Sequence, residues 1–390
     1  MPFGSPAPAS CGSCAGKMRI LEVTESFATG TMEVVRTVAE GAAREGHRVA
    51  IAYGKRPETP ARLREQVGAD VDLIALPWTG RSVAAQARAV HELRRLCRRW
   101  PPDVIHLHSS FAGFVGALGV ASFGPTIYTP HCYSFLGAGS ETRRALYRLA
   151  ERVIALRVEV VGAVSEHEAR LAKNLGASRV HVIPNGIPEI DRPGSSTRPW
   201  RAASPPKVVA AGRIVPQRRP LSTARILRSV SPLADVCWIG GPGPDPRLAQ
   251  AVQDLGITVT GWVSREEAIR QLSEATVFLN WSAWDSHPLS VLEAMASDVL
   301  VVGSDIEAHR ELLGTNQLAA TEEEAVNRVC AILADHGERR MMLEDQRRRT
   351  ADFGATRMVR DWLHLYEALS EQAVFNSAGH QAGLTRPLRA

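Results

Sequence analysis

The architecture of this chain is indicated by its sequence from 285 to 293, which reads Asp285-Ser286-His287-Pro288-Leu289-Ser290-Val291-Leu292-Glu293. Two carboxylates stand at its ends, separated by a turn and the start of an apolar helix. Residues 277–279 before it and 298–303 after it have the apolar character of buried strands. The sequence therefore predicts a strand–loop–helix–strand unit whose acidic residues lie at the carboxyl end of a strand, where open α/β sheets bind ligands. Glu293, about one turn into the helix, can accept hydrogen bonds from neighbouring hydroxyls, as on a ribose or a hexose.

A second segment, Gly212-Arg213-Ile214-Val215-Pro216-Gln217-Arg218, directly follows the expected strand 207–211. Its two arginines therefore come at the carboxyl end of a strand, upstream of the acidic stretch. Fixed cations at such a place can stabilise the negative charge that grows on a departing diphosphate. Either arginine alone could equally be a solvated side chain in an arginine-rich protein.

The acidic stretch resembles the Glu-x7-Glu signature of retaining nucleotide-sugar glycosyltransferases, in particular family 4, and the basic segment resembles the Gly-Arg-x4-Lys element of the same family. Here Asp285 stands where the first Glu is usual, and Arg218 where Lys is usual. The resemblance implies that Arg213 and Arg218 hold the donor diphosphate, that Asp285 approaches the sugar and that Glu293 holds the ribose. The donor-binding residues implied for the loop and helix between the two acids are Ser286, His287, Leu289 and Ser290.

Three weaker motifs occur at matching places. Gly30, in the loop after the first strand, would let the backbone approach a ligand at a helix N-terminus. His131 follows the strand 126–129 and resembles a histidine that the family places near the donor sugar. Gly241 belongs to a glycine-rich turn that the family places close to the nucleotide. His106 and His108 alternate along a strand and share a face. No carboxylate partner is expected near them, so strand-end packing near the acceptor cleft is predicted there rather than a metal site.

Alternating strands and helices predict two α/β domains with parallel sheets. The first series of strands is expected at 19–23, 49–53, 103–107, 126–129, 160–164 and 180–183, and the second at 207–211, 235–239, 258–261, 277–280 and 299–303. This organisation resembles the GT-B fold, two doubly wound Rossmann-like domains facing an interdomain cleft. The expected divisions are a tail at 1–17, an acceptor-side domain at 18–187, a linker at 188–206, a nucleotide-sugar domain at 207–352, a helix crossing back at 353–372 and a disordered tail at 373–390.

Composition narrows the class of protein. The chain has 390 residues and a net charge of +5, but no nucleic-acid-binding motif, so nucleic acid is not an expected partner. No apolar run reaches the ~20 residues that span a bilayer. The N-terminus lacks the order of a signal peptide, which predicts a cytoplasmic protein. Six cysteines at this length do not form a disulfide framework, and Cys11-x-x-Cys14 has no second pair to complete a zinc site.

The resemblance thus implies a metal-independent, retaining hexosyltransferase without a cofactor, whose co-substrate is a nucleotide-diphosphate sugar. The expected acceptor is a saccharide or a lipid-linked saccharide in bacterial polysaccharide or glycolipid assembly. Two alternatives remain, a GT-B nucleotide-sugar epimerase and a non-catalytic sugar-binding protein. The arginine-rich helical stretches 81–100 and 143–157 also suggest a peripheral membrane contact at the inner face of the plasma membrane, although an ordinary solvated face explains them as well.

Overall fold

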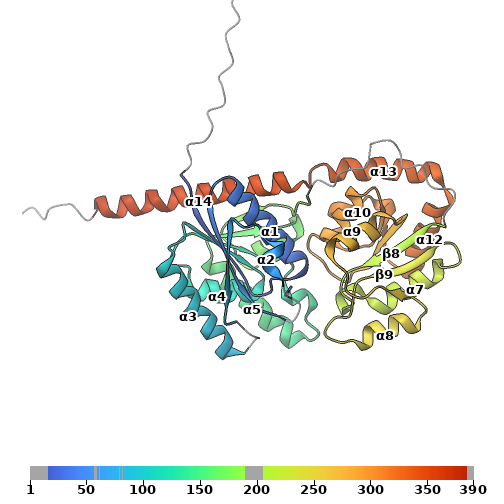
Figure 1. The fold of residues 1–390 in the computed structure, drawn as a ribbon, viewed down its shortest axis with the longest axis horizontal. Coiled ribbons are helices and arrows are strands. Elements are labelled where there is room, and N and C mark those ends of the chain that lie inside the picture. Colours follow the sequence, from blue (N-terminus) through green and yellow to red (C-terminus); the bar gives the residue numbers. More distant parts are fainter. Residues whose placement is uncertain are drawn as a thin grey trace, which may run out of the picture.

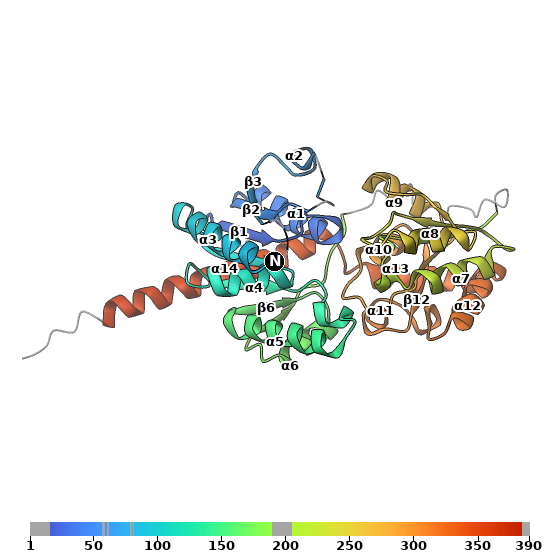
Figure 2. The ribbon, with the colours of Figure 1, turned by 90° about the horizontal axis from the view of Figure 1, so that it is seen from below.

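Two parallel sheets, each with helices on both faces, make up the structure (Figure 1), which is a computed structural model describing residues 16–56, 59–60, 62–78, 80, 82–188 and 205–383. Most of the predicted linker, 189–204, and the tail 1–15 lie outside the described residues. The two sheets lie in separate halves of the molecule, side by side in Figures 1 and 2.

The first sheet has the order β3-β2-β1-β4-β5-β6-β7, with every pairing parallel. Its strands are β1 (Arg19–Thr24), β2 (Arg48–Gly54), β3 (Val71–Leu76), β4 (Val104–His108), β5 (Thr126–Thr129), β6 (Val160–Ala163) and β7 (Val180–Val182). Its helices are α1 (Thr29–Arg44), α2 (Leu63–Gln66), α3 (Val83–Arg99), α4 (Ser110–Gly119), η1 (Ser134–Gly137), α5 (Glu141–Arg157) and α6 (Glu166–Asn174). Side chains alternate along the strands, so one face packs on α1 and the other on α3, α4 and α5.

The second sheet has the order β10-β9-β8-β11-β12-β13 and is also parallel. Its strands are β8 (Lys207–Ala211), β9 (Asp235–Ile239), β10 (Thr258–Val259), β11 (Val277–Asn280), β12 (Leu300–Ser304) and β13 (Leu318–Ala319). Its helices are η2 (Pro216–Arg218), α7 (Pro220–Val230), α8 (Arg247–Asp254), α9 (Arg265–Ser273), α10 (Leu289–Ala296), α11 (Glu307–Leu312), η3 (Thr315–Gln317), α12 (Glu322–Ala334) and α13 (His336–Thr350). The helices α7, α8 and α12 cover one face, and α9, α10 and α11 the other.

The last helix, α14 (Ala355–Gly383), returns to the first domain, as the sequence predicted (Figure 1). Its Met358, Trp362 and Tyr366 are buried in the same core as α1. The helix and α1 pack so closely that a Cβ at Gly41 would lie 2.4 Å from Cγ1 of Val359. The prediction of disorder from 373 was wrong up to 383, because this stretch has no proline to end the helix and Ala and Gln favour its continuation.

The expected strands are confirmed to within one or two residues at each end, but β3 and β13 were missed. The charged Asp72 interrupts the apolar run of β3, and β13 has only two residues, too few to show a period. No helix among the described residues has the length and apolarity needed to cross a membrane.

Candidate functional site

The basic segment and the acidic loop meet because β8 and β11 are neighbours in the second sheet. Parallel strands end at the same edge, so the segments that follow them lie together. Nη1 of Arg218 donates to Oδ2 of Asp285 at 2.8 Å, to Oγ of Ser282 at 2.7 Å and to Oδ1 of Asn280 at 2.9 Å. A cation is thus held at the carboxyl ends of two strands, next to the first acid of the stretch.

The second acid, Glu293, is buried on α10. It forms an ion pair with an arginine that the sequence did not indicate. Nη2 of Arg265, on α9, donates to Oε1 of Glu293 at 2.5 Å. Nε of the same guanidinium lies 3.2 Å from Oε2 of Glu33, on α1 of the first domain. Burial raises the pKa of Glu293, and Arg265 opposes that rise. Arg265 therefore favours the charged form of Glu293, which accepts hydrogen bonds. It also forms an ion pair with the first domain through Glu33.

The first domain approaches the acidic loop directly. A Cβ at Gly30 would lie 3.8 Å from Cδ1 of Leu289, so the start of α1 lies against the start of α10. A Cβ at Gly137 would lie only 2.7 Å from the ring of Trp284, just before the acidic stretch. Nδ2 of Asn185 donates to the carbonyl oxygen of His287 at 2.9 Å. Three segments of the first domain thus border the acidic stretch.

Glu168, buried on α6, connects the loop of His131 with the second domain. Its Oε1 accepts hydrogen bonds from Oγ of Ser286 at 2.6 Å and from the backbone N–H of Cys132 at 2.9 Å. His131 and Cys132 have φ values of 50° and 92°, which side-chain-bearing residues adopt only at a cost. Burial raises the pKa of the half-buried Cys132 thiol and the nearby Asp285 charge adds to the rise, so the loop of His131 and Cys132 lies beside Asp285.

His131 is also the outer end of a buried chain of hydrogen bonds. Its Nε2 lies 2.9 Å from Nδ1 of His108, whose Nε2 lies 2.6 Å from Oε2 of Glu22. His106 adjoins the same carboxylate, with its Nδ1 3.4 Å from Oε2. The expectation that no carboxylate stands near His106 and His108 was wrong, because Glu22 on β1 is in register with His106 on β4.

The ligand atoms of Glu22, His106 and His108 lie within 4.8 Å of one another, a grouping that could hold a metal. Each ring nitrogen of the two histidines also has a protein hydrogen-bond partner at 2.6–2.9 Å.

The remaining predicted residues lie around the same edge. Gly241 follows β9, next to β8, and its carbonyl accepts the N–H of Ile214 at 3.0 Å. Arg213 comes directly after β8 and Gly212. Several buried polar atoms of the described residues have no hydrogen-bond partner, and Nδ1 of His287 and Oγ of Ser290 are two of them. Such atoms are available to a polar ligand or to water.

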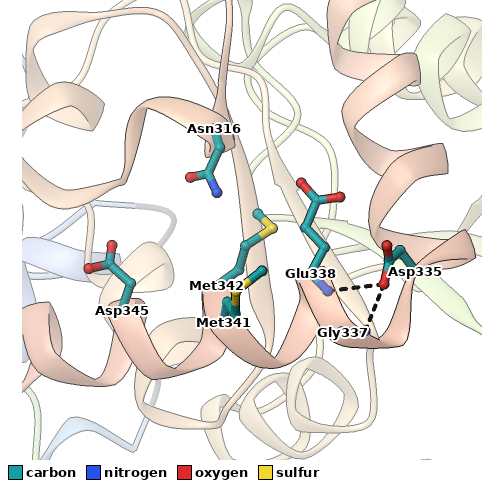
Figure 3. Close-up of a pocket in the computed structure, with 7 residues that line it drawn as sticks. All are labelled: Asn316, Asp335, Gly337, Glu338, Met341, Met342 and Asp345. Carbon is teal, nitrogen blue, oxygen red and sulfur yellow. Dashed lines mark hydrogen bonds between the residues drawn. The ribbon is translucent and has the colours of Figure 1, made fainter.

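A different hollow occurs in the second domain, lined by the start of α13 and by η3 (Figure 3). Its lining residues are Asn316, Asp335, Gly337, Glu338, Met341, Met342 and Asp345. Oδ1 of Asp335 accepts the N–H groups of Gly337 and Glu338 and so caps α13. None of the predicted site residues lines this hollow.

Sequence reasoning missed Glu22, Glu33, Glu168 and Arg265, which all bind partners far away in the chain. Glu168 does belong to a local pattern, Ser165-x-x-Glu168, typical of a helix start. That pattern predicts a bond within the cap, whereas the carboxylate bonds Val164, Cys132 and Ser286. Position in the sequence carried no indication of these roles.

Family models match both halves of the chain. The model described as Glycosyltransferase Family 4 matches residues 28–189, and the model described as Glycosyl transferases group 1 matches residues 205–335. The chain belongs to the family-4-like glycosyltransferases with the GT-B fold. It is accordingly a nucleotide-sugar glycosyltransferase.

Two relatives match most of the chain. An uncharacterized 41.2 kDa protein in the cps region of Klebsiella pneumoniae is 24% identical over 82% of this chain and 90% of its own. Alpha-maltose-1-phosphate synthase of Mycolicibacterium smegmatis is 25% identical over 80% of this chain and 92% of its own.

Among solved structures, sucrose-phosphate synthase from Thermosynechococcus elongatus matches with a TM-score of 0.76 and 20% identity, over 90% of this chain and 99% of its own. Anabaena HepE in complex with UDP and glucose matches with a TM-score of 0.74 and 17% identity, over 90% of this chain and all of its own. At these identities the structures show the shared fold.

Proposed function

We propose that this protein transfers a hexose from a nucleotide-diphosphate sugar to a saccharide hydroxyl with retention at the anomeric carbon and without a bound metal. The observation that carries the proposal is the meeting of a paired cation, Arg218 with Asp285, and a buried acceptor, Glu293, at one sheet edge bordered by His131 and Gly30. A diphosphate needs cations and a ribose needs an acceptor, and this edge offers both. The related HepE structure, which contains UDP and glucose, supports such a donor.

In the proposed reaction the acceptor hydroxyl attacks the anomeric carbon on the face that the diphosphate leaves. The new glycosidic C–O bond forms as the C–O bond to the β-phosphate breaks, and the hydroxyl proton passes to a phosphate oxygen. Arg213 and Arg218 stabilise the charge that develops on the diphosphate, a contribution that metal ions make in other transferases. Asp285 and His131 orient the sugar, and Glu293 accepts hydrogen bonds from the ribose.

In this proposal Arg218 exchanges part of its present bonding for the diphosphate. Its Nη1 already makes three hydrogen bonds to uncharged and acidic partners. Once a diphosphate draws the guanidinium away, Asp285 is left free to accept from a sugar hydroxyl. Without the donor, Arg218 and Asp285 satisfy each other's charge. When the donor binds, Arg218 binds the diphosphate and Asp285 binds the sugar.

The donor is tested by calorimetric titration of the protein with UDP-, GDP-, ADP- and dTDP-sugars without added metal and again in the presence of a chelator. We expect one nucleotide to bind selectively, and Glu293→Gln to weaken it at least tenfold. Glu267→Gln, which changes a half-buried acid of α9 that pairs with Arg270, is the matched control and should bind as wild type does. Failure of every nucleotide to bind, or binding only with added divalent metal, would contradict the proposal.

We further propose that the acceptor is lipid-linked and that the protein acts at the cytoplasmic membrane face through α5. Leu146, Leu149 and Leu156 on this helix are 62%, 59% and 60% exposed. Exposed arginines flank them at 143, 152 and 157. Apolar side chains beside cations suit an anionic lipid surface. By comparison α3, the other arginine-rich helix, exposes only Val83 among its large apolar side chains.

Flotation with vesicles containing anionic lipid at physiological salt tests this contact. We expect wild type to float and the double variant Leu146→Ser/Leu149→Ser to remain in solution. Leu233→Ser, which changes an exposed leucine of the second domain, should float as wild type does. Wild type that stays at the bottom of the gradient would dismiss the contact while leaving the transferase proposal untouched.

A further inference from the structure

The chain of hydrogen bonds behind His131 runs through the core of the first domain. From Glu22 it continues to Tyr366 of α14, whose hydroxyl donates to Oε1 of Glu22 at 3.1 Å. It ends at His106, with Nδ1 2.6 Å from the Tyr366 hydroxyl and Nε2 2.8 Å from Oγ1 of Thr129. Glu22, His106, His108 and Tyr366 are fully or almost fully buried, and only His131 is partly exposed.

The histidines of this chain are uncharged at neutral pH. Burial lowers the pKa of His108 to about 3 and takes those of His106 and His131 well below the usual value, with the neighbouring rings adding to the effect. A neutral imidazole carries one N–H, so each ring can donate through one nitrogen and accept through the other. The placement of one proton therefore fixes the placement of the next along the chain.

The chain of hydrogen bonds ends toward the site at Nδ1 of His131. No hydrogen bond to this atom occurs within the described residues, whereas Nε2 is committed to His108. The loop that carries it lies beside Asp285 and is bonded through Glu168 to Ser286 of the acidic stretch. A ligand held at that edge thus meets the one ring nitrogen of His131 that the core leaves available.

We propose that Glu22 and His108 are positioning residues that determine, through their hydrogen bonds, whether Nδ1 of His131 donates or accepts toward the substrate. With Glu22 protonated, its O–H donates to Nε2 of His108, Nδ1–H of His108 donates to Nε2 of His131, and Nδ1 of His131 carries hydrogen. With Glu22 ionised, Nε2–H of His108 donates to the carboxylate, Nε2–H of His131 donates to His108, and Nδ1 of His131 is bare. The two states differ by one proton, which leaves the chain at Nδ1 of His131.

The surroundings of Glu22 set where this change occurs. Burial raises its pKa to about 8, and the hydrogen bond from Tyr366 opposes the rise. The titratable groups that face it are His106 and His108 on β4 and Tyr366 on α14, while β2 places Ile51 beside it. Glu22 is therefore protonated below about pH 8, and Nδ1 of His131 is then a donor.

The proton positions are measured by NMR of full-length protein labelled with ¹⁵N-histidine, with the His131 signals assigned from His131→Gln. In wild type we expect Nδ1 of His131 to change from the protonated to the bare type of signal between pH 6.5 and 9.5, with a midpoint near the pKa of Glu22. In Glu22→Gln the amide has to donate to His108 because its oxygen accepts from Tyr366. Nδ1 of His131 should then stay protonated throughout.

Glu151→Gln is the matched control, because Glu151 is also a buried acid with a raised pKa, about 7, but binds Tyr128 and Ser110 on the opposite face of the sheet. In this variant Nδ1 of His131 should change from protonated to bare over the same pH range as in wild type. If Glu22→Gln does not fold, Tyr366→Phe decides, since losing that hydrogen bond should move the midpoint to higher pH. The same His131 behaviour in wild type and Glu22→Gln, or an unmoved midpoint in Tyr366→Phe, would overturn the proposal.

The consequence for catalysis rests on the proposed function and has its own measurement. The pH profile of kcat/KM should lose one limb in Glu22→Gln, and kcat should change at least tenfold while the donor Kd stays within twofold of wild type. A merely structural role would move both constants or neither and leave the profile's shape unchanged. Wild type without transferase activity would defeat the proposed function, whereas the ¹⁵N result would still decide the proton chain.

Discussion

The two domains place their charged groups in different ways. In the second domain Arg218 and Asp285, which form one ion pair of the site, stand on the segments that follow β8 and β11. In the first domain Glu22 and His108 lie inside strands, β1 and β4, and reach the site through His131. Strand-end charges can exchange partners with a ligand, whereas charges within a strand are fixed by the core and act at a distance.

The strongest test of this comparison is Arg218→Ala in the second domain. It removes a cation proposed to stabilise the leaving diphosphate and leaves Asp285 without its partner, so turnover should fall by about 10²–10³. The measurement is kcat for the donor and acceptor identified by binding. Arg225→Ala, which breaks an exposed pair with Glu322 on the same domain, should turn over as wild type does. A loss of only a few-fold in Arg218→Ala would show that strand-end charge is not what drives the reaction.

A second test concerns Glu168, through which the first domain holds the loop of His131. Glu168→Ala leaves the N–H groups of Cys132 and Val164 without an acceptor, and should lower the free energy of unfolding by roughly 3 kcal/mol. Urea denaturation measures this loss, and Glu166→Ala, which changes an exposed acid on the same helix, is the control. A change below about 1 kcal/mol would mean that water or the loop itself satisfies those donors.

A third test separates the charge of Glu293 from its position. Without Arg265, burial and the neighbouring Glu33 carboxylate raise the pKa of Glu293 unopposed, so Arg265→Ala should hold more of the neutral acid at neutral pH. Because the pKa of Glu293 in the folded protein is raised, this side chain becomes charged again as the pH increases. We expect nucleotide binding to be several-fold weaker than wild type at pH 6.5 and to recover toward pH 8.5, measured by calorimetry. Glu33→Gln, which removes only the partner across the domains, should show no such pH dependence.

The smallest effect is expected at the rim of the domain boundary. Arg170 on α6 and Glu307 on α11 form an exposed pair at 2.8 Å. Exposed pairs contribute about 0–1 kcal/mol, so Arg170→Ala should leave both the unfolding free energy and the donor Kd nearly unchanged. A loss as large as that of Glu168→Ala would contradict the distinction drawn between buried and exposed contacts across the boundary.

Sequence reasoning succeeded where a motif directly follows a strand. The strand β8 and the strand β11 were predicted at their observed bounds, and the motifs after them fall on adjacent strands. In contrast Arg265, which binds Glu293, and Glu22, which stands behind His131, gave no indication in the sequence. Glu22 stands between Leu21 and Val23 in the chain. The apolar character of this segment predicted a strand but gave no role to its one acid.

The sequence by itself determined two series of strands and helices, and the residues that follow β8 and β11. It could do so because periodicity and strand-end motifs are local, and parallel sheets bring strand ends to one edge. Only the tertiary structure decided that Glu293 is paired with Arg265, that Glu168 joins the loop of His131 to Ser286, and that Glu22 lies beside two histidines. The physical reason is that these side chains meet partners from strands and helices far apart in the chain, and strand order and domain packing bring them within hydrogen-bonding distance.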